Sequence, residues 1–106
     1  MITINIANDY TKTPGGRFSA EGSYSGEDFR ETKLFPKFLE AKKSGEELCV
    51  VLDGGYGYAT SFLEEAFGGL ARKTNDKDIL KIKIISDEEP ALVKKVRQYM
   101  KDALTK

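Results

Sequence analysis

The chain has 106 residues, with 17 basic side chains balanced by 17 acidic ones and no histidine. This length accommodates one domain, residues 1–106, and the zero net charge offers no general attraction to nucleic acid or to an anionic membrane surface. The absence of histidine excludes a Ser-His-Asp triad, a Cys-His pair and any imidazole metal site.

No apolar run approaches the roughly 20 residues that span a bilayer. The first residues have neither the charged region nor the apolar core of a signal peptide. The single cysteine, Cys49, cannot form an internal disulfide. We therefore expect a cytoplasmic protein without membrane contact, metal or cofactor.

The chain opens with isoleucines at positions 2, 4 and 6 that alternate with polar residues, which predicts a half-buried strand. Residues 9–26 are rich in Gly, Ser, Thr and Pro and predict a long loop. A short second strand near 17–20, paired as a hairpin, is an alternative for part of it. The sequence leaves open whether the 9–25 loop is ordered by itself, but loops of this length are often functional.

Ser25 predicts the N-cap of a helix, because two acidic residues follow it in the first turn. The apolar rhythm then predicts two helical pieces, 26–34 and 36–43, kinked at Phe35-Pro36 because proline lacks the backbone N–H. Gly45 suits the left-handed position that ends a helix.

The stretch from Cys49 to Leu70 organises the rest of the chain. Residues 47–53 predict a central strand, since a continuous apolar run indicates burial on both faces. A glycine-rich turn follows, and then a helix over 61–73, with Ser61 as N-cap and Glu64 completing a capping box. The Gly68-Gly69 pair within that helix suggests a close approach to a neighbouring backbone.

Residues 79–85 predict a third strand, in which Leu80, Ile82 and Ile84 face inward. A last helix starts at 87–90, where acidic residues precede a proline. Its apolar stripe is regular. It consists of Leu92, Val93, Val96, Tyr99, Met100, Ala103 and Leu104. Helices that alternate with strands predict a largely parallel sheet.

The turn Gly54-Gly55-Tyr56-Gly57-Tyr58 invites comparison with phosphate-binding loops. It lacks the Gly-Lys-Ser/Thr ending of a P-loop and the third glycine of a dinucleotide fingerprint. A tight turn with positive φ is the favoured interpretation. Tyr56 and Tyr58 should be partly exposed, as tyrosines in protein interfaces often are.

Asp53, Glu64 and Glu65 are the carboxylates available for acid–base chemistry. Glu64 is expected to cap the helix and Glu65 to point into water, so an enzyme is not favoured. Arg17, in the glycine-rich loop, could bind an anion or anchor the loop to Asp53, and the anchor is preferred.

Two motifs carry a family resemblance. The first combines residues 14–18 (Pro-Gly-Gly-Arg-Phe), 24–30 (Tyr-Ser-Gly-Glu-Asp-Phe-Arg) and 34–38 (Leu-Phe-Pro-Lys-Phe). The second combines residues 52–58 (Leu-Asp-Gly-Gly-Tyr-Gly-Tyr) with 61–72 (Ser-Phe-Leu-Glu-Glu-Ala-Phe-Gly-Gly-Leu-Ala-Arg). Over most of residues 1–86 the chain resembles the STAS-like domains of unknown function, which are bacterial and related to sulfate-transporter and anti-sigma-factor-antagonist domains.

This resemblance implies an α/β fold of order β-(β)-α-β-α-β-α, with a small, mostly parallel sheet and helices packed mainly on one face. In the antagonists a partner kinase phosphorylates a serine at a helix start. Ser61 is similar to that serine by position, and Thr60 is the second candidate. The antagonists have Asp-Ser-Ser-Gly there, whereas this chain reads Ala59-Thr60-Ser61-Phe62.

The resemblance therefore implies a non-enzymatic regulatory or protein-interaction module. Its partner would be a histidine-kinase-like (GHKL) ATPase or another regulatory protein. The alternative is a domain that binds a small ligand or a nucleotide at the Gly54–Gly57 turn. The expected partner surface comprises Arg17, Asp53, Tyr56, Tyr58, Ser61 and Glu65.

Overall fold

Three short strands form a parallel sheet in the order β1-β2-β3 in the computed structural model, which describes residues 1–104. They are β1 (Ile2–Asn5), β2 (Leu48–Val51) and β3 (Lys83–Ile85). Ile4 lies opposite Val50, and Val50 lies opposite Ile84. The apolar run around Cys49 is therefore the central strand, as its composition predicted.

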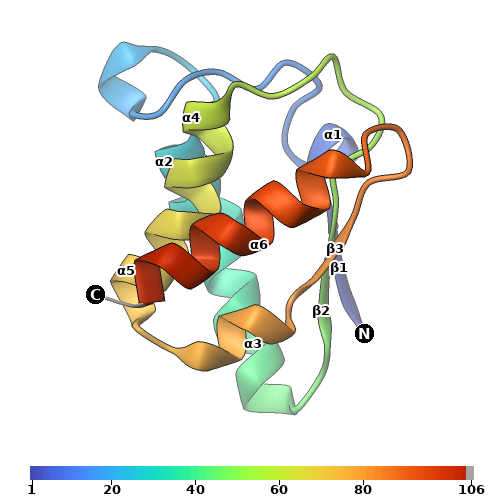
Figure 1. Ribbon diagram of the computed structural model, residues 1–106, viewed down its shortest axis with the longest axis vertical. Helices are drawn as coiled ribbons and strands as arrows, with labels where there is room; N and C mark the ends of the chain where they lie inside the picture. Colours follow the sequence, from blue (N-terminus) through green and yellow to red (C-terminus); the bar gives the residue numbers. More distant parts are fainter. Residues whose placement is uncertain (105–106) are drawn as a thin grey trace.

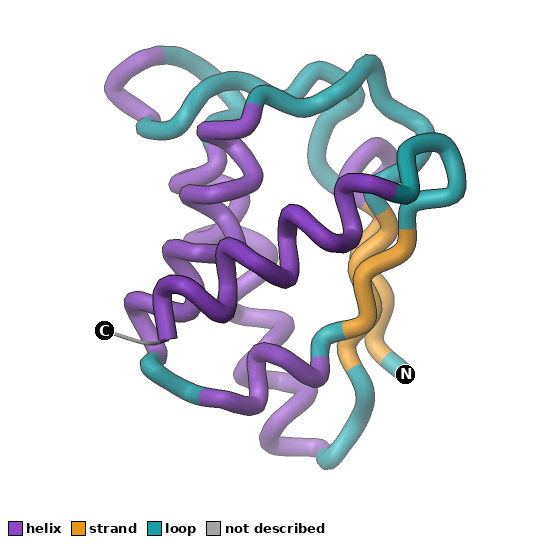
Figure 2. The backbone as a smooth tube through the Cα atoms, viewed as in Figure 1, coloured by secondary structure: helices purple, strands orange, loops and turns teal. Residues whose placement is uncertain are grey.

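The helices lie on one side of this sheet (Figures 1 and 2). Ile4, Val50 and Ile84 face them and are buried. Thr3 and Lys83 are exposed, and both are paired with Cys49, so all three lie on the outward face. This arrangement confirms the predicted small α/β sheet. The helices are α1 (Ile6–Asp9), α2 (Gly26–Phe29), α3 (Phe35–Ser44), α4 (Thr60–Leu63), α5 (Gly69–Thr74) and α6 (Ala91–Leu104).

Both predicted middle helices contain one wide π-helical turn. Residues Arg30–Leu34 form it between α2 and α3, and residues Glu64–Gly68 form it between α4 and α5. The predicted break at Phe35-Pro36 is absent, because α2, the first π-helical turn and α3 follow one another without a gap from Gly26 to Ser44. Pro36 has no N–H to donate, and just before it the N–H of Phe35 reaches back five residues to Arg30. Ser25 caps α2 by accepting the N–H of Asp28, and a left-handed Gly45 ends α3, both as predicted.

Two strand predictions needed correction. The alternative strand near 17–20 is a 3₁₀ turn, Ser19–Glu21, in which the Glu21 carboxylate accepts the N–H of Phe18 at 2.8 Å. The third strand is shorter than 79–85, because residues Lys77–Lys81 form another 3₁₀ turn capped by Asp76. In that turn Ile79, rather than Leu80, is the fully buried side chain.

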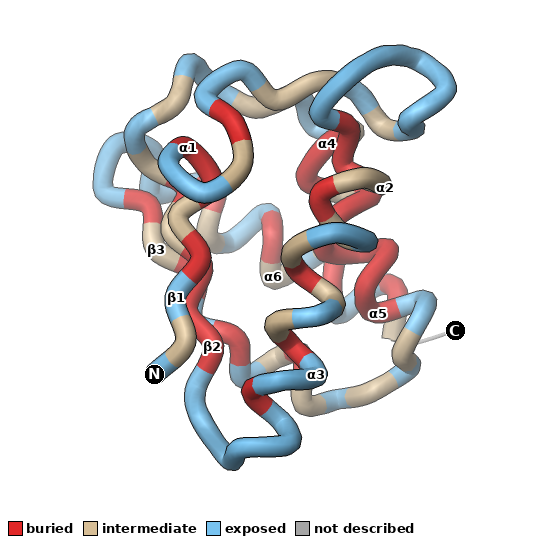
Figure 3. The backbone as a smooth tube through the Cα atoms, turned by 180° about the vertical axis from the view of Figure 1, so that it is seen from behind, coloured by how far each residue is buried: buried red, intermediate tan, exposed pale blue. Residues whose placement is uncertain are grey.

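The core lies between the sheet and the helices, and Figure 3 shows buried segments of both. Phe29 of α2 is its centre, with ring centroids 5.9 Å from Phe62 and 6.4 Å from Phe67. The predicted stripe of α6 closes the core. Its buried members are Leu92, Val96, Met100 and Ala103. Across residues 1–104, no helix combines the length and apolar character that crossing a membrane would require.

Candidate functional site

The loops that follow the three strands gather at one end of the molecule, which we call the carboxyl edge (Figure 1). It comprises residues 10–25, 53–59 and 86–90. The first two loops are joined by the N–H of Tyr56, which donates to the carbonyl of Lys12 at 2.9 Å. Within the first, Gly15 donates to Tyr24 and Gly26 donates to Gly16, each at 2.9 Å. The long loop is therefore held by backbone hydrogen bonds.

Asp53 joins the second loop to the third. Its carboxylate accepts the backbone N–H groups of Asp87 and Glu88, each at 2.9 Å, and these bonds lower the pKa of Asp53 below its ordinary value. The side-chain carboxylate of Glu88 in turn accepts a hydrogen bond from the backbone N–H of Gly54 at 2.9 Å. The predicted pairing of Arg17 with Asp53 is therefore wrong, since Asp53 ties two loops together.

The two tyrosines of the glycine-rich turn have different environments. Tyr56 is 85% exposed. Tyr58 is half-buried, packs against Phe62 at 5.7 Å between centroids, and donates to the carbonyl of Leu52 at 2.8 Å. Burial raises the pKa of Tyr58 to about 12. The predicted tight turn is confirmed, because its first and last glycines, Gly54 and Gly57, have φ of 98° and 113°.

The helix after this turn begins one residue earlier than predicted. Ala59 is the N-cap and Thr60 the first helical residue, so Ser61 is the second and does not cap. The predicted capping box with Glu64 is therefore wrong. Thr60 is exposed and Ser61 half-buried, and within residues 1–104 neither hydroxyl has a hydrogen-bond partner.

Glu65 also departs from its prediction, because its side chain is only 11% exposed and does not face water. Arg30 holds it: its Nη1 donates to Glu65 Oε2 at 2.6 Å and to the Glu65 carbonyl at 2.9 Å. Arg17 of the long loop donates to Glu64 at 2.5 Å and lies 3.3 Å from Glu65. The preferred role of Arg17 as an anchor holds, with Glu64 and Glu65 in place of Asp53.

Arg72 completes what we call the arginine–glutamate network: Arg17, Arg30, Glu64, Glu65 and Arg72. Its guanidinium donates to Glu64 at 2.7 and 3.2 Å and lies 3.7 Å from Glu65. Hydrogen bonds from Arg72 and Arg17 hold the pKa of Glu64 below its ordinary value, against the opposing effect of burial. The network joins the long loop to both π-helical turns.

The Gly68-Gly69 pair makes room for this network. A Cβ at Gly69 would overlap Nη1 of Arg30, and one at Gly68 would lie 2.5 Å from Glu64 Oε2. The predicted close approach is real, but the neighbours are charged side chains instead of a backbone.

These contacts limit the chemistry available. Glu64 and Glu65 are each bound by arginines, and Asp53 belongs to a separate cluster, so the three candidate carboxylates do not meet. A crevice of about 150 Å³ beside Asp53 is also lined by Tyr58, Ser86 and Glu88. Among residues 1–104, no group of three side chains is arranged to hold a metal ion.

Three residues of this region were missed from the sequence. Arg30 and Arg72 were not predicted as site residues, and only the fold brings them to Glu64 and Glu65. Tyr24 has φ of 57°, a left-handed conformation rare for a bulky residue, and is 48% exposed. Its ring meets Tyr10 edge-on at 5.5 Å. Nothing in the local sequence indicates that backbone conformation.

Comparison with known proteins adds a family assignment. A family model described as a STAS-like domain of unknown function matches residues 25–91, well over half of the chain. The match starts after Arg17, so it is shorter at the amino end than the resemblance over residues 1–86. Searches of curated proteins and of solved structures found no match. With its parallel sheet and helices, the chain belongs to the family of STAS-like domains of unknown function.

Proposed function

We propose that this domain is a non-enzymatic, cytoplasmic regulatory module that binds a protein partner through the carboxyl edge. The observation that carries the proposal is Tyr56, which is 85% exposed although its turn is tied to Lys12 and, through Gly54 and Glu88, to the loop after β3. An aromatic ring on a rigid support gives a partner a large contact area at a low cost in conformational entropy.

The long loop supports the same interpretation. Phe18 and Tyr24 are 45% and 48% exposed. They belong to the long loop, which lies at the same end of the molecule as the loop of residues 53–59 (Figure 1). The left-handed backbone of Tyr24 costs on the order of 1–3 kcal/mol, and strain of this kind clusters at binding and switch sites. The partner we infer is a GHKL-type ATPase or another regulatory protein.

Phosphorylation of Ser61, or of Thr60, would regulate this surface. Ser61 lies four residues, about one helical turn, before Glu65. Side chains at this spacing are neighbours on the surface of a helix. A phosphate adds about two negative charges, so it would repel Glu65 and compete with the network for Arg17. Arg17 anchors the long loop, and its transfer to the phosphate would change the surface that carries Phe18 and Tyr24.

Affinity capture from native cells tests the proposal, with the wild-type domain, Tyr56→Ala, Ser61→Glu and Ser61→Ala as baits. Leu39→Ala is the matched control, because Leu39 is 48% exposed but lies on α3, away from the carboxyl edge. We expect a partner that wild type and Leu39→Ala retain and Tyr56→Ala loses. A partner retained equally by Tyr56→Ala would contradict the assigned surface. Loss by Ser61→Glu but not by Ser61→Ala would support regulation.

The alternative, a nucleotide at the Gly54–Gly57 turn, has less support. The crevice beside this turn is about 150 Å³, below the roughly 300 Å³ at which small-molecule sites begin, and Asp53, Glu88 and Glu89 line it. Those carboxylates would repel phosphate. Thermal unfolding with increasing ATP or GTP separates the two functions, since a rising midpoint would favour the nucleotide.

A further inference from the structure

The sheet has two free edges within residues 1–104, because β1 and β3 each pair with β2 alone. Along an edge strand, alternate residues direct their backbone N–H and C=O groups toward the neighbouring strand or away from it. The N–H of Ile2 donates to the carbonyl of Glu47, directly before β2, at 2.8 Å, so Ile2 and Ile4 direct these groups toward β2. The backbone N–H and C=O groups of Thr3 therefore point outward at the β1 edge.

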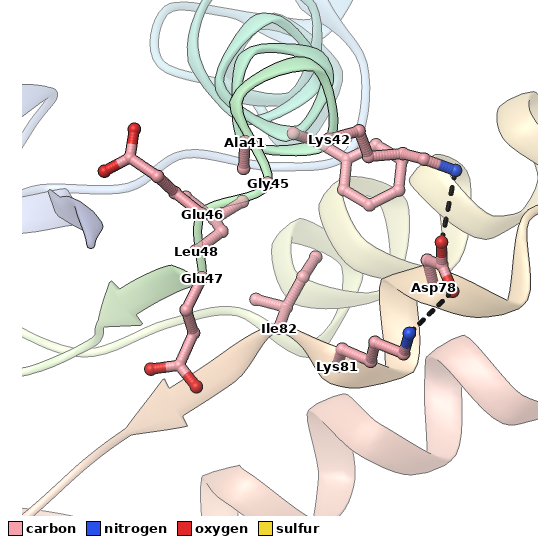
Figure 4. A pocket seen from close by; sticks show the side chains of 10 residues that line it. Ala41, Lys42, Gly45, Glu46, Glu47, Leu48, Asp78, Lys81 and Ile82 are labelled. Atoms are coloured by element: carbon pink, nitrogen blue, oxygen red, sulfur yellow. Dashed lines mark ion pairs between the residues drawn. The ribbon is translucent and has the colours of Figure 1, made fainter.

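The β3 edge is protected against a further strand. The guanidinium of Arg97 on α6 donates to the carbonyls of Leu80 and Ile82, directly before β3, at 3.0 and 3.1 Å. Lysines stand at this edge as well. Lys83 of β3 is exposed, and the side chain of Lys81, seen in Figure 4, is 80% exposed. Lysines on an edge strand discourage pairing with another strand.

The β1 edge lacks this protection. Its residues, Ile2–Asn5, include no charged side chain and no proline. Thr3 is exposed, and Ile2 is only half-buried although it packs against the core. The far end of the edge is closed, because the carboxylate of Asp9 accepts the N–H of Asn5 at 2.7 Å. The open part is therefore centred on Thr3, and an uncharged, open edge of this kind is a template for another strand.

We propose that two copies of this chain associate through their β1 edges, antiparallel about a two-fold axis at Thr3. The two Thr3 residues form a hydrogen-bonded pair, in which each N–H donates to the carbonyl of the other. Ile2 lies opposite Ile4 of the second copy, in the kind of pair where side chains approach most closely. The half-buried Ile2 thereby gains apolar contact, and the two three-stranded sheets become one continuous sheet.

A second copy is the occupant that this edge fits best. The strand is self-complementary about Thr3, and the chain has no net charge to oppose self-association. Pairing of β1 with β3 of another copy would repeat without closing, and Arg97 and the lysines at the β3 edge oppose it. The contact is small, so we expect a dissociation constant of roughly 0.01–1 mM. This proposal and the one for the carboxyl edge do not depend on each other.

Sedimentation equilibrium of the full chain between about 10 µM and 2 mM measures the association. Hydrogen exchange followed by ¹⁵N NMR locates it. The amide of Thr3 should exchange several-fold more slowly at the high concentration than at the low one. The amide of Ile84, which points outward at the β3 edge because Ile85 faces β2, should not change. A chain that stays monomeric, or equal slowing at Thr3 and Ile84, would overturn the proposal.

Substitutions at Thr3 test the pairing itself. Thr3→Lys places like charges directly opposite each other, and Thr3→Pro removes the donated N–H while leaving the β1–β2 hydrogen bonds in place. Each should weaken dimerisation about ten-fold or more. Thr32→Lys is the matched control, the same change at an exposed site in the first π-helical turn, and should leave the dissociation constant within about two-fold of wild type. Unchanged dimerisation of both Thr3 variants would refute the β1 edge, and circular dichroism shows that each variant is folded.

Discussion

Replacement of Gly69 by alanine should destabilise this protein, although the same change in an ordinary helix stabilises it. Gly69 begins α5 directly after the second π-helical turn. The new Cβ would overlap Nη1 of Arg30 and would lie 3.3 Å from Glu65 Oε2. A methyl group needs about 3.5 Å from a heavy atom, so the guanidinium must withdraw by roughly an ångström.

The magnitude follows from two opposing contributions. Alanine in place of a helical glycine gains about 1 kcal/mol. The withdrawal disrupts two hydrogen bonds of Arg30 to Glu65, at 2.6 and 2.9 Å, within an ion pair whose side chains are only 12% and 11% exposed. Breaking a buried ion pair costs about 3–5 kcal/mol. Arg17 still contacts Glu65, so we expect a net loss of about 1–3 kcal/mol after both contributions are combined.

Urea unfolding followed by circular dichroism measures this loss, since small domains unfold in one cooperative transition. The same change in an Arg30→Met background is the control. Without the guanidinium the overlap is gone, and Gly69→Ala should there stabilise the protein by up to about 1 kcal/mol. If Gly69→Ala stabilised both backgrounds equally, the steric account of the Gly68-Gly69 pair would be refuted.

Three further outcomes follow from the site. Arg17→Met should loosen the long loop, so hydrogen exchange at the amide of Gly26, which donates to Gly16, should speed up while that of Val50 does not. The lowered pKa of Asp53 means that its contribution to stability is present above its ordinary pKa and is lost as the pH falls below about 4; Asp53→Asn should flatten this acid dependence of the unfolding free energy. The raised pKa of Tyr58 acts in the opposite direction, so the free energy of unfolding should fall as the pH rises from about 10 to 12, and should fall less in Tyr58→Phe; urea unfolding of the two proteins across this pH range measures the difference.

Features set by a few neighbouring residues could be predicted from the sequence. The cap at Ser25 and the left-handed Gly45 each depend on one turn of chain, and the stripe of α6 depends on a repeat within a single helix; the structure confirms all three. The central strand around Cys49 could also be predicted, because a continuous apolar run of that length is typical of a buried strand in a parallel sheet.

Features set by contacts between distant residues could not be predicted. Glu65 was expected in water because a regular helix would turn it away from the core, whereas the π-helical turn Glu64–Gly68 changes the rotation of the chain there. Its partner Arg30 is 35 positions away. Ser61 failed as a cap because Ala59 already has the extended backbone of an N-cap, φ −70° and ψ 142°. A good capping residue nearby does not move the helix start.

The outward face of the sheet has one consequence for how this domain can be studied. Cys49 lies on that face in the central strand, yet it is only 3% exposed, and burial raises the pKa of its thiol. It is the sole cysteine of a chain that contains no tryptophan. A thiol reagent can therefore react only when the residues around Cys49 move aside. The rate of that reaction reports how often the outward face around β2 becomes accessible, without an engineered probe.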